Sequence, residues 1–142
     1  MPAVVGYVPG VFDMFHVGHL NIVRNARLAC DHLIAGVVSD ERAVAAKGKG
    51  PVVPAAERLE ILRSIRYVDE AVLEDVPEKL EMWHRLHFDV LIKGDDWRGT
   101  AKGDRLEKDM ASVGVQVVYL PYTVHTSSTM LRQVLHAKLA NA

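Results

Sequence analysis

The chain contains 142 residues, 49% of them hydrophobic and 25% charged, a composition typical of one globular domain with a buried core. Its 17 basic and 18 acidic residues nearly cancel, which argues against an extended nucleic-acid surface. No apolar run approaches the ~18 residues of a membrane span, and the N-terminal residues lack a signal-peptide pattern, so we expect a cytoplasmic protein with no membrane partner. The single cysteine, Cys30, excludes an internal disulfide.

Apolar runs alternate with amphipathic stretches, and this alternation predicts a doubly wound α/β domain with a mainly parallel five-stranded sheet. The predicted strands are Val4–Val8, Leu33–Ser39, Glu70–Leu73, Asp89–Lys93 and Val115–Leu120. The predicted apolar helix faces are Leu20, Val23, Ala26 and Cys30; Leu59, Leu62 and Ile65; and Leu131, Val134, Leu135 and Leu139. Ser127 or Ser128 is available to cap the last helix, and the glycine- and proline-containing segment 46–54 is predicted to be a flexible loop.

A glycine-containing turn of sequence GVFDMFHVGH, residues 10–19, joins the first predicted strand to the first predicted helix. Such a turn directs unpaired backbone N–H groups and the positive end of the helix dipole at one point, which suits an anion. Gly10 allows close approach of the backbone to a ligand, and Gly18 leaves space between the imidazoles of His16 and His19. Both imidazoles add hydrogen-bond donors near pH 7, so the segment predicts a phosphate site.

The two histidines also have the spacing of a zinc pair, but zinc needs three or four protein ligands and no Cys or His cluster completes the set. His84 and His87 repeat the spacing without a preceding strand or a glycine turn, and we expect that pair to lie on a solvated helix surface. The phosphate interpretation of His16 and His19 is therefore favoured over a structural or metal role.

Further motifs follow in a fixed order: Lys47-Gly48-Lys49, Glu57-Arg58, Arg66-Tyr67-Val68-Asp69-Glu70, Gly94-Asp95-Asp96-Trp97 and Thr126-Ser127-Ser128-Thr129. The ordered set resembles the cytidylyltransferase branch of the nucleotidyltransferases, and is similar to bacterial glycerol-3-phosphate cytidylyltransferases. This resemblance implies a Rossmann-like nucleotidyltransferase domain over residues 1–142. It also implies in-line transfer of a cytidylyl group from CTP to a small phosphorylated alcohol such as glycerol 3-phosphate, giving CDP-glycerol and pyrophosphate, with Mg²⁺ accompanying the triphosphate and a homodimer as the assembly.

The resemblance also implies roles for individual residues. His16, His19 and Lys47 are the expected catalytic residues, and Lys47 and Lys79 the expected acceptor-binding residues. The expected nucleotide-binding residues are Gly10, Val11, Phe12, Asp13, His16, His19, Lys49, Arg66, Asp96, Thr123, Thr126, Ser127, Ser128 and Thr129. Two of these assignments have alternatives: Asp13 is also suited to ordering the turn, and Arg66 to a surface ion pair with Asp69 or Glu70. Arg58 is a further candidate for supporting the phosphates. No metal ligands are assigned.

The chain departs from the family pattern at Tyr122, where the family has an arginine. A guanidinium on a phosphate contributes roughly 1.5–3 kcal/mol, so another cation must replace it or triphosphate binding is weaker. Arg132, His125 and Arg98 are the candidates. The same loop helps read the base in the family, which leaves the choice of CTP open.

Three other functions fit the same motifs. One is an adenylyltransferase that uses ATP, like archaeal FAD synthases and heptose-phosphate adenylyltransferases. Another is an ethanolamine- or choline-phosphate cytidylyltransferase, for which Trp83, Trp97 and Tyr122 are available to surround a quaternary ammonium. The last is a non-catalytic nucleotide-binding module, which the presence of both histidines and both loop lysines disfavours.

Overall fold

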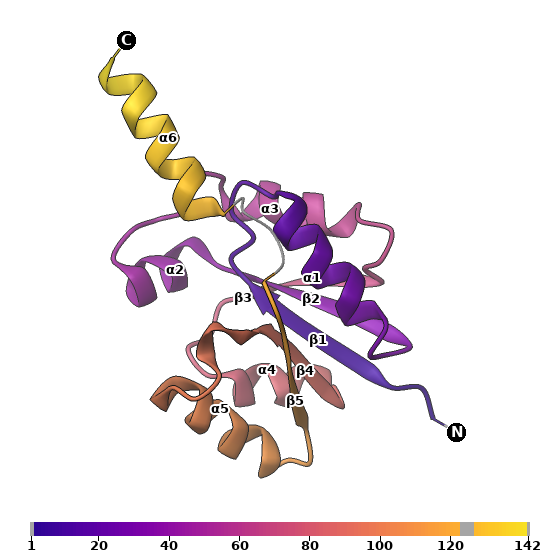
Figure 1. Ribbon diagram of the computed structural model, residues 1–142. Helices are drawn as coiled ribbons and strands as arrows, with labels where there is room; N and C mark the ends of the chain where they lie inside the picture. Colours follow the sequence, from indigo (N-terminus) through magenta and orange to yellow (C-terminus); the bar gives the residue numbers. More distant parts are fainter. Residues whose placement is uncertain (1, 123–126, 142) are drawn as a thin grey trace.

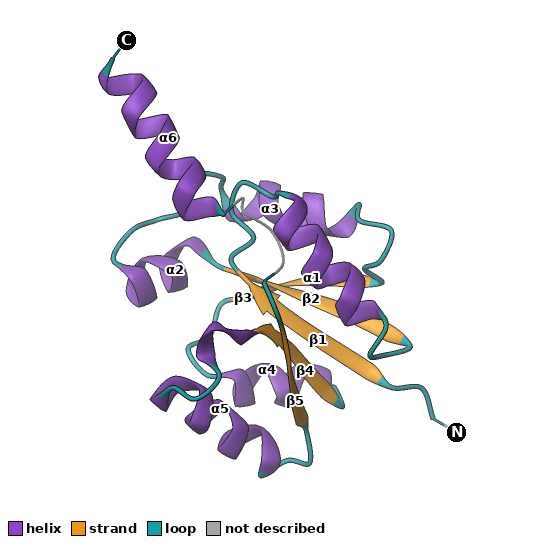
Figure 2. Cartoon of the chain, in the orientation of Figure 1, coloured by secondary structure: helices purple, strands orange, loops and turns teal. Residues whose placement is uncertain are grey.

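The computed structural model describes residues 2–122 and 127–141, and its centre is one sheet of five parallel strands (Figures 1 and 2). The strands are β1 Val5–Gly10, β2 His32–Val38, β3 Glu70–Glu74, β4 Val90–Gly94 and β5 Gln116–Leu120. Their order is β3-β2-β1-β4-β5, and every paired strand is parallel to its neighbour. The chain therefore builds outward from β1 to β3 and then returns to the other side of β1, which places a topological switch point between β1 and β4.

Helices cover both faces of the sheet, as Figure 2 shows. They are α1 Val17–Arg27, α2 Asp40–Lys47, α3 Ala55–Arg63, α4 Lys79–Leu86, α5 Ala101–Ala111 and α6 Ser128–Ala140, with a short 3₁₀ turn η1 at Asp95–Trp97. Helices α1 and α3 lie on one face and α4 and α5 on the other, whereas α6 projects away from the body of the molecule (Figure 1). No helix among the described residues is both long and apolar enough to cross a membrane.

Alternating side chains of the strands divide the core into two layers. Val8, Leu33, Val37 and Ile92 pack with the buried residues of α1 and α3. Tyr7, Ile34 and Leu91, their neighbours along the same strands, pack with Met82 of α4 and with Leu106 and Met110 of α5. Because the side-chain period of a strand is two, one central sheet can bury apolar residues on both of its faces. The doubly wound α/β fold predicted from the sequence is confirmed, and the sheet is entirely parallel.

Two helices, α2 and α5, were not predicted, and each buries few large apolar side chains. In α2 only Ala43 is buried, and in α5 the buried positions are Gly103, Leu106 and Met110 among charged neighbours. Their N-caps identify them better, since Ser39 accepts from the backbone N–H of Arg42 and Thr100 from that of Gly103. The predicted loop 46–54 therefore starts too early, because its first two residues still belong to α2.

The last helix forms where it was predicted, and Ser127 is its N-cap. The expectation that its apolar face is buried is wrong for the described chain, because α6 contains no buried residue. Val134 and Leu135 are about half exposed and Leu139 is 72% exposed. The helix leaves the body after its first turns, so the sheet does not cover its apolar face (Figure 1).

Candidate nucleotidyl-transfer site

A cleft of about 860 Å³ lies at the carboxyl ends of the strands, next to the switch point between β1 and β4. Its wall is formed by the end of β1 and the turn after it, the ends of β2, β3 and β4, helix α2, Tyr122 after β5, and the N-terminal part of α6. Open α/β sheets bind their ligands at this position, because the loops there leave a crevice on either side of the switch point.

The cleft brings most of the predicted site residues together. Those that line it are Gly10, Val11, Phe12, Asp13, His16, His19, Lys47, Lys49, Lys79, Asp96, Ser127, Ser128 and Thr129. Thr123 and Thr126, and with them His125, lie outside the described residues. The expectations for these three residues therefore remain predictions.

Arg66 lies away from the cleft. Its side chain is exposed, and its guanidinium lies 5.4 Å from the centroid of the Tyr67 ring. The alternative ion pairs are also not formed, because Asp69 pairs with Arg27 and Glu70 with His32. Within a single chain, Arg66 therefore neither lines the cleft nor pairs with Asp69 or Glu70.

The two histidines at the start of α1 are held in one orientation by backbone donors. His16 is the N-cap, and its Nδ1 accepts from the backbone N–H of Gly18 at 3.0 Å. Nδ1 of His19 accepts from the backbone N–H of His16 at 3.3 Å. An imidazole nitrogen that accepts carries no proton, so in each neutral ring the proton is on Nε2. The two rings stack 3.9 Å apart, and both therefore offer an Nε2–H donor to a ligand in the cleft.

Both histidines are held in the neutral form. Burial first, and then the neighbouring His16 and Lys47, lower the pKa of His19 to about 4, while Asp13 opposes them. The rings of Phe12 and Phe15 pack against that of His19, 5.6 and 5.4 Å away. Burial also lowers the pKa of His16. At neutral pH the site thus presents two neutral donors instead of two imidazolium cations.

The turn before the histidines has an unusual backbone. Phe12 and Met14 have φ angles of 54° and 50°, a region that residues other than glycine rarely occupy. The small size of Gly10 also accommodates the Phe12 ring, because a Cβ there would lie 3.0 Å from it. Gly10 lines the cleft, and its close approach to a ligand stays a prediction.

Asp13 connects three segments around the histidines. Its carboxylate accepts from the backbone N–H groups of Val52 and Val53 at 2.8 and 2.9 Å and from the Arg132 guanidinium at 2.7 Å. Its backbone carbonyl accepts from the Ser128 hydroxyl at 2.6 Å. Burial raises the pKa of Asp13, but these donors outweigh that effect and hold it below its ordinary value. The contacts match the alternative in which Asp13 orders the turn.

Arg58 does not support a phosphate, contrary to our expectation. It is completely buried, and its guanidinium donates to the carbonyls of Val11, Val38 and Val53 at 2.7–2.8 Å and to the Asp40 carboxylate at 2.7 Å. A buried cation is tolerated only when its donors are satisfied, and these four acceptors satisfy it. The residue therefore joins the ends of β1 and β2 to the loop before α3.

Lys47 and Lys49 flank Gly48 on the α2 side of the cleft. Lys47 is the last residue of α2, Gly48 has a φ of 75°, and both lysine side chains are exposed. A left-handed glycine at this point ends the helix and lets the chain turn back along the cleft. Both ammonium groups consequently face the same opening as the histidines.

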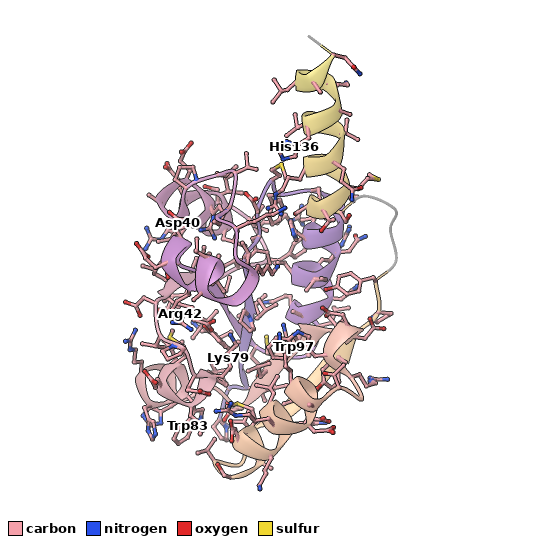
Figure 3. The ribbon with its side chains drawn as sticks, turned by 90° about the vertical axis from the view of Figure 1, so that its left-hand side faces the viewer. Asp40, Arg42, Lys79, Trp83, Trp97 and His136 are labelled. Carbon is pink, nitrogen blue, oxygen red and sulfur yellow. The ribbon has the colours of Figure 1, made fainter. Side chains whose placement is uncertain are left out.

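The far half of the cleft is built around a buried carboxylate. The Tyr7 ring crosses β2 at Gly36, where any side chain would overlap it, and its hydroxyl donates to Glu74 at the end of β3 at 2.6 Å. Burial first, and then the Glu74 charge, raise the pKa of Tyr7. The other oxygen of Glu74 accepts from Lys79 at the start of α4. Lys79 is thereby fixed in the cleft wall (Figure 3).

Sequence reasoning missed Lys93, Glu74 and Arg42, all of which line the cleft. Lys93 is near the end of β4, where a charged residue closing an apolar strand was the available signal. Its ammonium lies 3.9 Å from the centroid of the Trp97 ring. Burial, followed by the charge of Lys79, lowers its pKa to about 8.

Of the three candidate cations for the missing family arginine, only Arg132 can be placed in the cleft. Arg98 lies over the Tyr119 ring instead, 5.2 Å from its centroid. Tyr122 itself covers Gly94, where a side chain would overlap it, and its hydroxyl donates to Asp96 at 3.3 Å. Burial and that carboxylate raise the pKa of Tyr122 to about 12, so it is a neutral donor.

His84, His87 and Trp83 lie outside the cleft. His84 and His87 are exposed and pack against the edges of Trp83, as expected for a helix surface. Trp83 donates to the carbonyl of Phe88 at 3.1 Å and does not line the cleft, so the aromatic residues proposed for choline do not all converge. Among residues 2–122 and 127–141, no three His, Cys, Asp or Glu side chains are grouped to hold a metal ion.

A doubly wound sheet with a histidine-lined anion site at its switch point defines a nucleotide-binding α/β protein. The family model described as cytidylyltransferase-like matches residues 7–134. The chain therefore belongs to the cytidylyltransferase-like family, within the nucleotidyltransferase superfamily.

Comparison with curated proteins and solved structures agrees with this assignment. The chain is 40% identical over 118 residues to the FAD synthase of Pyrococcus abyssi, covering 81% of this chain and 78% of that protein. It is 42% identical over 97 residues to the ethanolamine-phosphate cytidylyltransferase of Arabidopsis thaliana, covering 63% of this chain but only 22% of that protein. The fold matches that of a lipopolysaccharide core biosynthesis protein from Thermoplasma volcanium GSS1, with a TM-score of 0.74 at 22% identity over 88% of this chain and 100% of the other.

Proposed function

We propose that the protein transfers a nucleotidyl group from a nucleoside triphosphate to a small phosphorylated alcohol, with CTP and glycerol 3-phosphate as the leading pair. The observation that carries this proposal is a single cleft with cations in both of its halves. The first half holds the histidine donors, Lys47, Lys49 and the N-terminus of α6, and the second holds Lys79 and Lys93 beside the carboxylates of Glu74 and Asp96. Two anionic reactants repel one another, and cations in both halves offset that repulsion.

The first half suits a triphosphate. Ser127 caps α6, so the free N–H groups and positive dipole end of this helix lie beside the histidines. An acceptor phosphate oxygen attacks the α-phosphorus in line as the bond from that phosphorus to the α–β bridging oxygen breaks and pyrophosphate leaves, and negative charge grows on the equatorial and bridging oxygens. The Nε2–H groups of His16 and His19 donate to those oxygens, and Lys47 supports the incoming phosphate. No covalent intermediate with the protein is needed, so positioning and charge stabilisation supply the catalysis.

A second candidate uses ATP in place of CTP. The similarity to the FAD synthase of Pyrococcus abyssi extends over 78% of that protein, whereas the similarity to the cytidylyltransferase of Arabidopsis thaliana covers 22% of it. FAD contains an adenylyl group joined to a flavin phosphate, so the same transfer chemistry with ATP and another phosphomonoester fits the cleft. The base contacts are not defined by the described residues.

Magnesium and a second copy of the chain complete the proposal. The described residues do not group three ligands for a metal, but Mg²⁺ is commonly held by substrate phosphates, waters and one or two carboxylates. In the cleft, Asp96 is the carboxylate that would bind a Mg²⁺ ion held by the triphosphate. The homodimer implied by the resemblance is supported by the exposed apolar side chains of α6 at Met130, Val134, Leu135 and Leu139.

The test is pyrophosphate release with Mg²⁺ present, in which CTP and ATP are each combined with glycerol 3-phosphate, ethanolamine phosphate, choline phosphate and FMN. The proposal predicts turnover with CTP and glycerol 3-phosphate and formation of CDP-glycerol. Turnover with ATP alone would support the second candidate. Absence of pyrophosphate in every combination would contradict transfer to a phosphorylated acceptor of these classes.

A further inference from the structure

The aromatic surface in the acceptor half of the cleft is already covered by a cation of the chain itself. Lys93 and Trp97 both line the cleft, and the Lys93 ammonium lies 3.9 Å from the centroid of the Trp97 ring. Lys102 lies near the same ring at 5.7 Å, but it is exposed and does not line the cleft. Figure 3 shows Trp97 and Lys79 below α2 on the cleft side of the molecule.

Trp97 is held firmly in this position. It ends the 3₁₀ turn η1, and its carbonyl accepts from the hydroxyl of Thr100 at 2.6 Å and from the Thr100 backbone N–H at 3.1 Å. Gly103 of α5 packs directly against that carbonyl, where any side chain would overlap it. These contacts fix the backbone of Trp97, and its partly buried side chain packs against the core layer that contains Leu106 and Met110, so the indole and the ammonium on its face form part of the cleft wall.

The charges around Lys93 leave its ammonium available to act on a ligand. The charged groups that affect it are Lys79, Asp96, Glu74 and Lys47. Both oxygens of Glu74 are engaged by Tyr7 and Lys79, and Asp96 accepts from Tyr122. Across the described ranges 2–122 and 127–141, no carboxylate oxygen lies within 4.0 Å of the Lys93 ammonium.

An aromatic face in a binding site is the usual place for a quaternary or primary ammonium group of a ligand, because the ring quadrupole attracts cations. In this cleft, the corresponding place on Trp97 is occupied, and a second cation there would meet a like charge. We propose that Lys93 is a specificity-determining residue that rejects phosphorylated alcohols with a cationic end, such as choline phosphate, and admits those with an uncharged hydroxylated end, such as glycerol 3-phosphate. This inference rests on the proposed function, since it concerns the acceptor half of the same site.

The charge state of Lys93 gives the inference a pH dependence. With a pKa of about 8, the Lys93 side chain is mainly protonated at neutral pH and loses its positive charge at higher pH. The trimethylammonium group of choline phosphate keeps its charge throughout. Discrimination against choline phosphate should therefore weaken as the pH rises through 8.

The experiment measures direct binding of glycerol 3-phosphate and of choline phosphate by calorimetry, without nucleotide. Four proteins are compared: the wild type, Lys93→Met, Lys93→Arg and the matched control Lys102→Met. We expect the wild type and Lys102→Met to bind glycerol 3-phosphate at least about tenfold more tightly than choline phosphate. Lys93→Met should bring the two affinities within about threefold, and Lys93→Arg should retain the preference. Thermal melting of each variant checks that it is folded.

The same titrations near pH 7 and pH 9.5 should show the wild-type preference falling at the higher pH, while that of Lys93→Met stays constant. A wild-type preference for choline phosphate, an unchanged ratio in Lys93→Met, or failure of both ligands to bind would each overturn the inference. Failure of the proposed function can be told apart from failure of this inference. In the first case no pyrophosphate is released, but the ratio of the affinities for glycerol 3-phosphate and choline phosphate can still be measured. If release occurs but the Lys93→Met ratio is unchanged, the function stands and the role of Lys93 is wrong.

Discussion

The Arg132 guanidinium donates to the Asp13 carboxylate at 2.7 Å and so connects the last helix to the turn that precedes His16 and His19. Asp13 is almost fully buried, whereas α6 contributes no buried residue and is otherwise attached to this turn by the hydrogen bond between Ser128 and the Asp13 carbonyl. The ion pair therefore sets where the N-terminus of α6 lies relative to His16 and His19. The ion pair also links two segments of the cleft wall that are more than a hundred residues apart in the sequence.

Arg132→Met should weaken nucleotide binding more than it weakens folding. The substitution removes a charge-assisted hydrogen bond, and we expect KM for the triphosphate to rise about tenfold or more, in line with the roughly 1.5–3 kcal/mol of such bonds. Steady-state kinetics and thermal melting measure the two effects. Lys138→Met on the same helix is the matched control, and an equal effect of both variants would argue against the ion pair as the cause.

Arg58→Met should destabilise the fold. Removing the guanidinium leaves the carbonyls of Val11, Val38 and Val53 without this buried donor, and one buried polar group left unsatisfied typically costs about 1–3 kcal/mol, whereas the Asp40 carboxylate is about half exposed and keeps the Ala55 N–H. Urea unfolding measures the loss. The exposed Arg63, also in α3, provides the control, since Arg63→Met should change the free energy of unfolding by less than about 0.5 kcal/mol. Unchanged stability in Arg58→Met would show that the buried network contributes little.

Stability should fall in mild acid because His19 is held neutral. Its pKa is about 4 in the folded chain against an ordinary 6.5. Below pH 6.5 the unfolded chain binds a proton that the folded chain does not bind until about pH 4, so this stabilising contribution is complete above 6.5 and is lost between 6.5 and 4. The loss amounts to at most about 3 kcal/mol.

Unfolding free energies measured at several pH values across that window test the effect of His19. His19→Asn should flatten the dependence, while the exposed His84→Asn should leave it as in the wild type. If the two variants follow the same curve as the wild type, another group controls the acid sensitivity.

The homodimer is tested by sedimentation. Leu139→Lys places a charge on the exposed apolar face of α6, where Leu139 is 72% exposed, and should shift the wild-type dimer toward monomer. Leu28→Lys is the control, because Leu28 is 84% exposed but lies at the C-cap of α1. A wild-type monomer at micromolar concentration would contradict the dimer, and dissociation by both substitutions would point to another surface.

The strands and the anion-binding turn could be predicted because their signals are local. Residues 10–19 combine a strand end, a glycine and two histidines within one turn of chain, and the apolar strands are short uninterrupted runs. Helix α2 was not predicted because it buries only Ala43. In α5, Gly103, Leu106 and Met110 have helical spacing, but only two of the three are large apolar residues and their neighbours are mostly charged.

The roles of Arg58 and Lys93 could not be predicted because they depend on distant partners. Arg58 reaches acceptors at the ends of β1 and β2, and Lys93 meets the Trp97 indole, which packs against α5. The position of Lys93 at the end of an apolar strand hints at burial, but the neighbouring residues identify the contact partners of neither cation. Only the packing of the elements decides between these possibilities.

We propose that neutral Nε2–H donors of His16 and His19 stabilise the phosphate as it is transferred. This role is measured by kcat for pyrophosphate release by His16→Ala and His19→Ala, compared with the wild type and with His84→Ala, at saturating substrates. We expect folded variants in which kcat falls at least about 100-fold for the first two, since a lost donor to the transition state costs on the order of 100- to 1000-fold. His84→Ala should turn over normally. Near-normal turnover in His16→Ala or His19→Ala would show that the imidazoles do not stabilise the transition state.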